Sequence, residues 1–322
     1  MSEIYTSHQL FREFIDERHS LGFVYKTDEG IIRRFLRDFT DPIDGNIEFT
    51  EEYVLAQVSR KFNQSDNTVL RNISAVNCFL DFVIRKGFKA YIIPPKVFPK
   101  EKRNFIAYIF TNDEINRILS VADSIPFEKQ NPLRHFQLPV MFRILFNCGL
   151  RSSELLNLKV GDVDLDENVL TILNTKFHKS RLIPFSDAVS DAIKIYFSQL
   201  PPLSDDDWLF RSPKGNRKYS TSGLHSNFRL LLKLADIPYG GKGKGPRLHD
   251  IRHTFAVHCL NNWVLNGTDL SVALPILSRY LGHVDIHGTQ KYLQLTAEMH
   301  PDIVDKMEKM FSYVIPELEV SK

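Results

Sequence analysis

The chain has 322 residues, of which 43% are hydrophobic and 25% charged, and it carries a formal net charge of +2. This length suits two domains, and the composition is that of an ordinary globular protein. No apolar run approaches the length of a membrane span, and the first residues lack a secretion signal, so we expect a cytoplasmic protein with no membrane partner. The three cysteines form no CxxC pair and are expected to be reduced core thiols, not a disulfide framework; they are Cys78, Cys148 and Cys259.

Residues 1–92 are predicted to form a bundle of four amphipathic helices. Each predicted helix begins with a residue suited to capping its first turn, and apolar residues follow at helical spacing. The predicted starts are at Thr6, Thr27, Thr50 and Ser65, and the third helix is expected to run to Phe62.

Residues 93–104 are predicted to form an extended linker between two domains, because three prolines restrict the backbone and remove hydrogen-bond donors. The linker is also cationic, since residues 85–103 contain seven lysines and arginines and one acid. One such run is usually a solvated face. A second run at residues 211–252, with ten cations and two acids, favours a polyanionic partner when it accompanies a phosphate-handling site.

Residues 105–322 are predicted to form a domain of helices with a small β-sheet. Two apolar segments, Val169–Leu173 and Leu182–Phe185, are predicted to pair as a hairpin. Lys176 lies in the connection between them, which gives the hairpin a basic tip. The predicted fold is therefore mainly α, with a helical bundle before a mixed α/β domain that ends in a helix.

Two arginines in this second part suit the binding of a phosphate group. Attack on a phosphodiester builds negative charge on the non-bridging oxygens, and arginine binds such oxygens in bidentate fashion. Arg151 follows Gly149 at a predicted helix start, and Glu154 lies three residues later, where it can orient Arg151. Arg252 lies three residues after His249, on the same face of another predicted helix. Taken one by one, these residues are equally well explained as ordinary helix-surface partners.

Tyr292 is the candidate nucleophile. A phenol, with a pKa of about 10, attacks poorly unless cations stabilise the phenolate and an imidazole accepts its proton. His283 lies nine residues before Tyr292, and the intervening stretch is polar. His253 follows Arg252 directly and is expected to point elsewhere, as a packed or surface residue.

Together these segments closely resemble the tyrosine recombinase, or phage integrase, family. The family signature consists of a Gly-Leu-Arg-x-x-Glu-Leu-x-x-Leu box, a lysine in a β-hairpin, a His-x-x-Arg box, a Leu-Gly-His turn and a nucleophilic tyrosine. The chain matches each element in order, over about residues 111–296. The hairpin lysine would protonate the leaving 5′-oxygen; Lys176 is preferred for this role and Lys179, in the same loop, is the alternative. The catalytic residues that the resemblance implies are Tyr292, Arg151, Lys176, His249, Arg252, His283 and Glu154.

The resemblance also implies a double-stranded DNA partner that carries a specific recombination site. Strand exchange joins two duplexes, so the expected active form is a homotetramer on DNA. Its C-terminal helix would dock either into a neighbouring subunit or onto its own chain. The phosphotyrosine stores the energy for rejoining, so neither a metal nor another cofactor is implied. The basic residues expected to contact DNA are Lys96, Lys100, Lys102, Arg103, Lys242 and Lys244.

The implied activity is site-specific recombination through a 3′-phosphotyrosyl intermediate and a Holliday junction, as in the integrase or transposase of a mobile element. A chromosome-dimer resolvase is the alternative within the family. A type IB topoisomerase-like enzyme would use the same chemistry to relax supercoils without a recombination site. A non-catalytic DNA-binding protein on the same fold is a further alternative, but the complete set of catalytic residue types argues against it.

Overall fold

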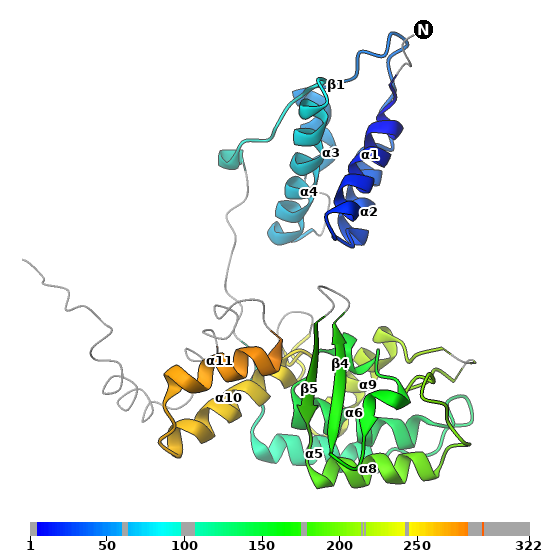
Figure 1. The fold of residues 1–322 in the computed structure, drawn as a ribbon, viewed down its shortest axis with the longest axis vertical. Coiled ribbons are helices and arrows are strands. Elements are labelled where there is room, and N and C mark those ends of the chain that lie inside the picture. The colour runs from blue at the N-terminus through cyan, green and yellow to red at the C-terminus, as the bar shows by residue number, and fades with distance from the viewer. Residues whose placement is uncertain are drawn as a thin grey trace, which may run out of the picture. The chain divides into compact units, whose positions relative to one another are not determined.

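The computed structural model describes residues 5–59, 64–97, 107–174, 179–213, 215, 217–241, 245–282 and 292. The chain divides into two compact units, Met1–Phe105 and Ile106–Lys322, and each has its own hydrophobic core (Figure 1). Among the described helices, none is long and apolar enough to cross a membrane. All three cysteines are free.

The described residues of the first unit form a bundle of four helices, as the sequence predicts (Figure 1). Thr6, Thr50 and Ser65 each accept a hydrogen bond from a backbone N–H in the first turn of a helix, which satisfies a donor that the helix leaves unpaired. Phe62, the predicted end of the third helix, lies outside the described residues. The helices are α1 Ser7–Ser20, α2 Lys26–Phe35, α3 Glu51–Val58 and α4 Asp66–Arg85, and the strands β1 Glu48–Phe49 and β2 Lys89–Ala90 pair in parallel.

The start of the predicted linker differs from an extended segment. Ile93 is 1% exposed and belongs to the core of the first unit. It exchanges two hydrogen bonds, of 2.9 and 3.1 Å, with the side chain of Asn77. Residues Pro95–Val97 then form a 3₁₀ turn, η1. Proline is tolerated at the first position of such a turn, because its missing N–H would have no partner there.

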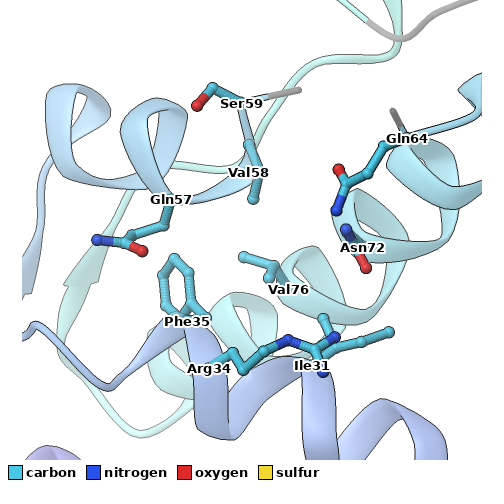
Figure 2. Close-up of a pocket in the computed structure, with 9 residues that line it drawn as sticks. All are labelled: Ile31, Arg34, Phe35, Gln57, Val58, Ser59, Gln64, Asn72 and Val76. Carbon is cyan, nitrogen blue, oxygen red and sulfur yellow. The ribbon is translucent and has the colours of Figure 1, made fainter. Parts of the chain in front are cut away.

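A pocket of about 210 Å³ opens between α2, α3 and α4 (Figure 2). Phe35 and Val76 contribute apolar walls, and Gln57, Gln64 and Asn72 contribute polar groups (Figure 2). All of these residues belong to the first unit.

The second unit combines helices with a three-stranded sheet in the order β3-β4-β5. Strand β4, Val169–Asn174, pairs with β5, Lys179–Pro184, as the predicted antiparallel hairpin. Strand β3, Val163–Asp164, adds to the other edge of β4 and was not predicted. The helices are α5 Asn112–Asp123, α6 Arg134–Cys148, α7 Ser152–Leu155, α8 Asp187–Ser198, α9 Thr221–Leu234, α10 Asp250–Leu265 and α11 Leu270–Leu281, with a 3₁₀ turn, η2, at Val160–Asp162. The predicted fold class, mainly α with a small sheet, is confirmed.

Two clusters of buried side chains lie in the described part of the second unit. The larger cluster includes the inner faces of α6 and α9, and the smaller one lies between α10 and α11, which run side by side in Figure 1. Gly149 ends α6 and Gly282 ends α11, with φ angles of +58° and +65°. A Cβ atom at Gly149 would lie 2.4 Å from Cδ1 of Phe255 on α10, so only glycine fits between these helices. The end of α6 thereby packs directly against α10.

Candidate active site

Arg151 and Glu154 are joined by two hydrogen bonds at the start of the short helix α7. Arg151 is the N-cap residue, and its backbone N–H donates to Oε2 of Glu154 over 2.8 Å. Its guanidinium Nη1 donates to Oε1 of the same carboxylate, also over 2.8 Å. The Arg151 side chain is 35% exposed and that of Glu154 is 13% exposed. The carboxylate thus fixes the arginine while part of the guanidinium still faces solvent.

Arg252 lies on the first turn of α10 and is 1% exposed. Its Nη1 donates to the carbonyl oxygen of Gly149 over 3.1 Å, and its Nη2 donates to that of Leu281 over 2.5 Å. Burial and then the nearby charge of Arg151 lower the pKa of Arg252 to about 10. Arg252 therefore stays charged at neutral pH, in a place where water screens its charge poorly.

The carboxyl end of α11 is bound by three arginines from three separate segments. Arg181 on β5 donates through Nε to the carbonyl of Tyr280 over 2.8 Å. Arg252 donates to the next carbonyl, that of Leu281, and Arg151 donates through Nη2 to Gly282 over 3.1 Å. The last carbonyls of a helix have no partner within the helix and carry its negative dipole end, so they attract cations. Three successive carbonyls thus hold three guanidinium groups together.

Tyr292 lies at this cluster and is 2% exposed. Burial raises the pKa of its phenol, while the charge and hydrogen bond of Arg252, followed by the charge of Arg151, lower it. The two predicted phosphate-binding arginines are therefore the groups that favour the phenolate form of Tyr292. A buried phenol beside two guanidinium groups can act as a nucleophile toward a bound phosphate.

Two histidines extend the site around Tyr292. His249 lies immediately before α10, and its ring centroid is 4.8 Å from that of His253. The ring of His253 is in turn 5.5 Å from that of Tyr292. Partial burial, followed by the charges of Arg252 and Arg247, lowers the pKa of His249, which keeps its imidazole neutral at pH 7. The expectation that His253 points elsewhere was wrong, because its ring packs near those of both His249 and Tyr292.

Comparison with known proteins agrees with this geometry. The model of the phage integrase family matches residues 109–299. The chain is also 31% identical over 312 residues to "Putative integrase/recombinase y4rB" of Sinorhizobium fredii, a match that covers 94% of this chain and 98% of that protein. The chain belongs to the phage integrase family. It is a tyrosine recombinase, and so an enzyme that breaks and rejoins DNA.

One further relative and one solved structure are similar to this tyrosine recombinase. Tyrosine recombinase XerD of Caulobacter vibrioides is 29% identical over 286 residues, with 87% of each chain covered. The fold is similar to that of XerH site-specific recombinase in a post-cleavage complex with its palindromic difH substrate, with a TM-score of 0.64 and 19% identity. That match covers 94% of this chain and 85% of the XerH chain.

The structure brings together five of the seven predicted catalytic residues of the recombinase. These are Arg151, Glu154, His249, Arg252 and Tyr292. Lys176 and His283 lie outside the described residues. For Lys179 only the backbone is described, at the first position of β5, where it pairs with Asn174.

Of the residues predicted to contact DNA, only Lys96 is described; it is exposed, in η1 of the first unit. The other five lie outside the described residues: Lys100, Lys102, Arg103, Lys242 and Lys244. The predicted C-terminal helix also lies outside them. Within the described part of the chain, no cluster of three or more His, Cys, Asp and Glu side chains could hold a metal ion.

Arg181 is a member of the site that the sequence interpretation missed. It alternates along β5 with Leu182, which is 66% exposed, and so shares a face with Ile183, which is 0% exposed. A charged residue on the buried face of a strand signals a partner in the interior, because an unpaired buried charge is costly. That signal is present in the sequence, but the partners are not, since Glu154 and Tyr280 lie 27 and 99 positions away.

Proposed function

We propose that this recombinase cleaves DNA by attack of the Tyr292 hydroxyl on a scissile phosphate. The phenolic oxygen forms a bond to phosphorus, and the bond between phosphorus and the 5′-oxygen breaks. The products are a 3′-phosphotyrosyl linkage and a free 5′-hydroxyl. The observation that carries this proposal is the position of Tyr292 beside Arg252, whose charge and hydrogen bond favour the phenolate.

The predicted catalytic residues have the following roles in the proposed reaction. Arg151 and Arg252 bind the non-bridging oxygens and stabilise the charge that develops on them. Glu154 holds Arg151 through its two hydrogen bonds. His249, neutral because of its lowered pKa, accepts a proton during attack. Lys176 in the β4–β5 connection, or Lys179 at the start of β5 as the alternative, gives a proton to the leaving 5′-oxygen.

We propose that the free 5′-hydroxyl of one duplex attacks the phosphotyrosine of another, first forming and then resolving a Holliday junction. Two duplexes and two exchanges require four active sites, which supports a homotetramer on DNA. The similarity to an integrase/recombinase over nearly the full length of both chains favours the integrase or transposase of a mobile element. The similarity to XerD supports chromosome-dimer resolution as the second candidate role.

The test is covalent capture on a nicked suicide duplex, built from the sequence that the wild-type protein enriches from a random duplex pool. The wild type is expected to form an adduct that survives denaturation, because the 5′-hydroxyl fragment diffuses away before rejoining. Tyr292→Phe should bind the duplex and form no adduct. An adduct with Tyr292→Phe would remove Tyr292 as the nucleophile, and adducts on duplexes without the enriched sequence, with supercoil relaxation, would favour a topoisomerase.

A further inference from the structure

We infer that Arg181 is a positioning residue of the recombinase site, which holds the Glu154 carboxylate and the carboxyl end of α11 together and so fixes Arg151 and Arg252. The inference rests on the proposed function of Tyr292 and its two arginines. It adds a residue on a third segment, strand β5, to which the sequence interpretation gave no role.

Arg181 makes two hydrogen bonds that join distant parts of the site. Its Nε donates to the carbonyl of Tyr280 over 2.8 Å, and its Nη2 donates to Oε2 of Glu154 over 2.9 Å. The side chain of Arg181 is 14% exposed and that of Glu154 is 13% exposed, so the ion pair between them is poorly screened by water. A guanidinium can serve two such acceptors at once because its donors form a rigid fork.

Glu154 is the point at which the guanidinium groups meet. Oε1 accepts from Arg151, Oε2 accepts from Arg181, and Arg252 lies 3.8 Å from Oε2. Without Arg181 the carboxylate would have only Arg151 and Arg252 to balance its charge. Both would then be drawn toward Glu154 and away from a bound phosphate. Arg181 therefore leaves these two arginines available to the substrate.

Gly282 completes the contact between Arg181 and α11. Its φ angle of +65° favours glycine, and a Cβ atom there would lie 2.9 Å from Nη1 of Arg181. The arginine is thus packed directly against the residue whose carbonyl accepts from Arg151. A shift of Arg181 would move the carboxyl end of α11, to which all three arginines are bonded.

The test measures single-turnover cleavage with limiting enzyme and a saturating excess of the nicked suicide duplex, which is built from the sequence that the wild-type protein enriches. The rate constant reports the positioning of the arginines, whereas the amplitude reports the fraction of folded enzyme. Arg181→Ala is expected to lower the rate constant by about tenfold to a hundredfold, in keeping with a misplacement of roughly 1 Å. Binding to an intact duplex and the amplitude should stay close to wild type. Arg181→Lys should recover part of the rate, since lysine keeps the charge but cannot serve both acceptors.

A double-mutant cycle with Glu154→Gln tests whether Arg181 influences the rate constant through Glu154. If Arg181 acts by holding Glu154, the combined loss will be smaller than the product of the two single losses by at least about fivefold. Arg143→Ala is the matched control, because Arg143 also bonds a carboxylate, that of Asp123, at 2.6 and 2.7 Å in the same unit. The control should keep the wild-type rate constant.

Three outcomes would overturn the inference. The first is that Arg181→Ala cleaves with the wild-type rate constant. The second is that Arg181→Ala lowers only the amplitude, and that Arg143→Ala lowers it as well. The third is that the rate loss of the double variant equals the product of the two single losses. The failure of the proposed function would look different, because the wild type itself would then form no adduct.

Discussion

Arg252 donates a hydrogen bond of 3.1 Å to the carbonyl oxygen of Gly149, although 103 positions separate the two residues. The bond fixes the His-x-x-Arg segment against the loop that leads into Arg151. This bond links the segments that carry the two arginines of the site. The two differ in burial, because Arg252 is 1% exposed and Arg151 has a side chain that is 35% exposed.

This difference in burial predicts that the two alanine substitutions have similar effects on cleavage but different effects on stability. Arg151→Ala and Arg252→Ala should each slow cleavage by about two to three decades, the usual cost of losing one transition-state donor. Arg252→Ala should also lower the melting temperature more, because it leaves a cavity and two carbonyls without their donor. Single-turnover cleavage and thermal melts measure the two effects separately. Wild-type cleavage by either variant would remove that arginine from the reaction.

His253 is predicted to support Tyr292 by ring packing. Its ring lies 5.5 Å from that of Tyr292 and 4.8 Å from that of His249. His253→Ala should slow cleavage by about tenfold or more, because Tyr292 loses a wall that holds its ring. His253→Phe keeps a ring of similar size and should recover most of the rate. If the phenylalanine variant is as slow as the alanine variant, the nitrogen atoms of His253 matter and packing is not its role.

The lowered pKa of His249 predicts the direction of the pH dependence of cleavage. Because this pKa lies below 6.5, the imidazole is neutral above that pH and protonates as the pH falls below it. The cleavage rate should therefore change little around pH 7 and should decline as the pH falls below 6.5. His249→Gln should be slow throughout and lack this decline. The charged groups that set the pKa of His249 are Arg252, Arg247, Asp250 and Arg151.

Arg247 offers a control for this assignment. It lowers the pKa of His249 and pairs with Asp250 over 3.0 Å, and Asp250 raises that pKa. Arg247→Gln removes a cation and frees an anion, and both changes raise the pKa of His249. The acid decline should move to higher pH in this variant. A decline that stays in place would assign the titration to a group other than His249.

Local chemistry explains how much of the first unit the sequence could predict. Thr6, Thr50 and Ser65 cap helices because their hydroxyls accept from backbone N–H groups a few residues away. Such signals operate within one turn of a helix and need no knowledge of the tertiary fold. Ile93 shows the limit, since it was predicted to begin the linker but is buried in the first core and bonded to Asn77.

Some residues of the site can be recognised from their neighbours in the sequence, whereas others are defined only by contacts with distant residues. Arg151, Arg252 and Tyr292 could be proposed from the sequence because each lies in a motif whose neighbours are also recognisable. Arg181 and His253 were missed or misjudged because their partners lie far along the chain. Tyr292 follows His253 by 39 positions, and no periodicity within α10 indicates that the two rings meet. Tertiary contacts of this kind are decided by how α10, α11 and β5 pack.

The hairpin lysine proposed as the general acid can be identified by changing the leaving group. The leaving 5′-oxygen needs a proton as its bond to phosphorus breaks, whereas a 5′-sulfur leaves readily without one. If Lys176 is the acid, Lys176→Ala should cleave normal DNA slowly and be substantially rescued on a duplex with a 5′-bridging phosphorothioate. Arg252→Ala should show much less rescue, because Arg252 stabilises charge and does not donate the proton. The register of β4 and β5 places Lys179 at the end of the strand pair, opposite Asn174, whereas Lys176 lies in the connection beyond it. Rescue of Lys179→Ala without rescue of Lys176→Ala would therefore assign the acid to the strand end and overturn the choice of Lys176.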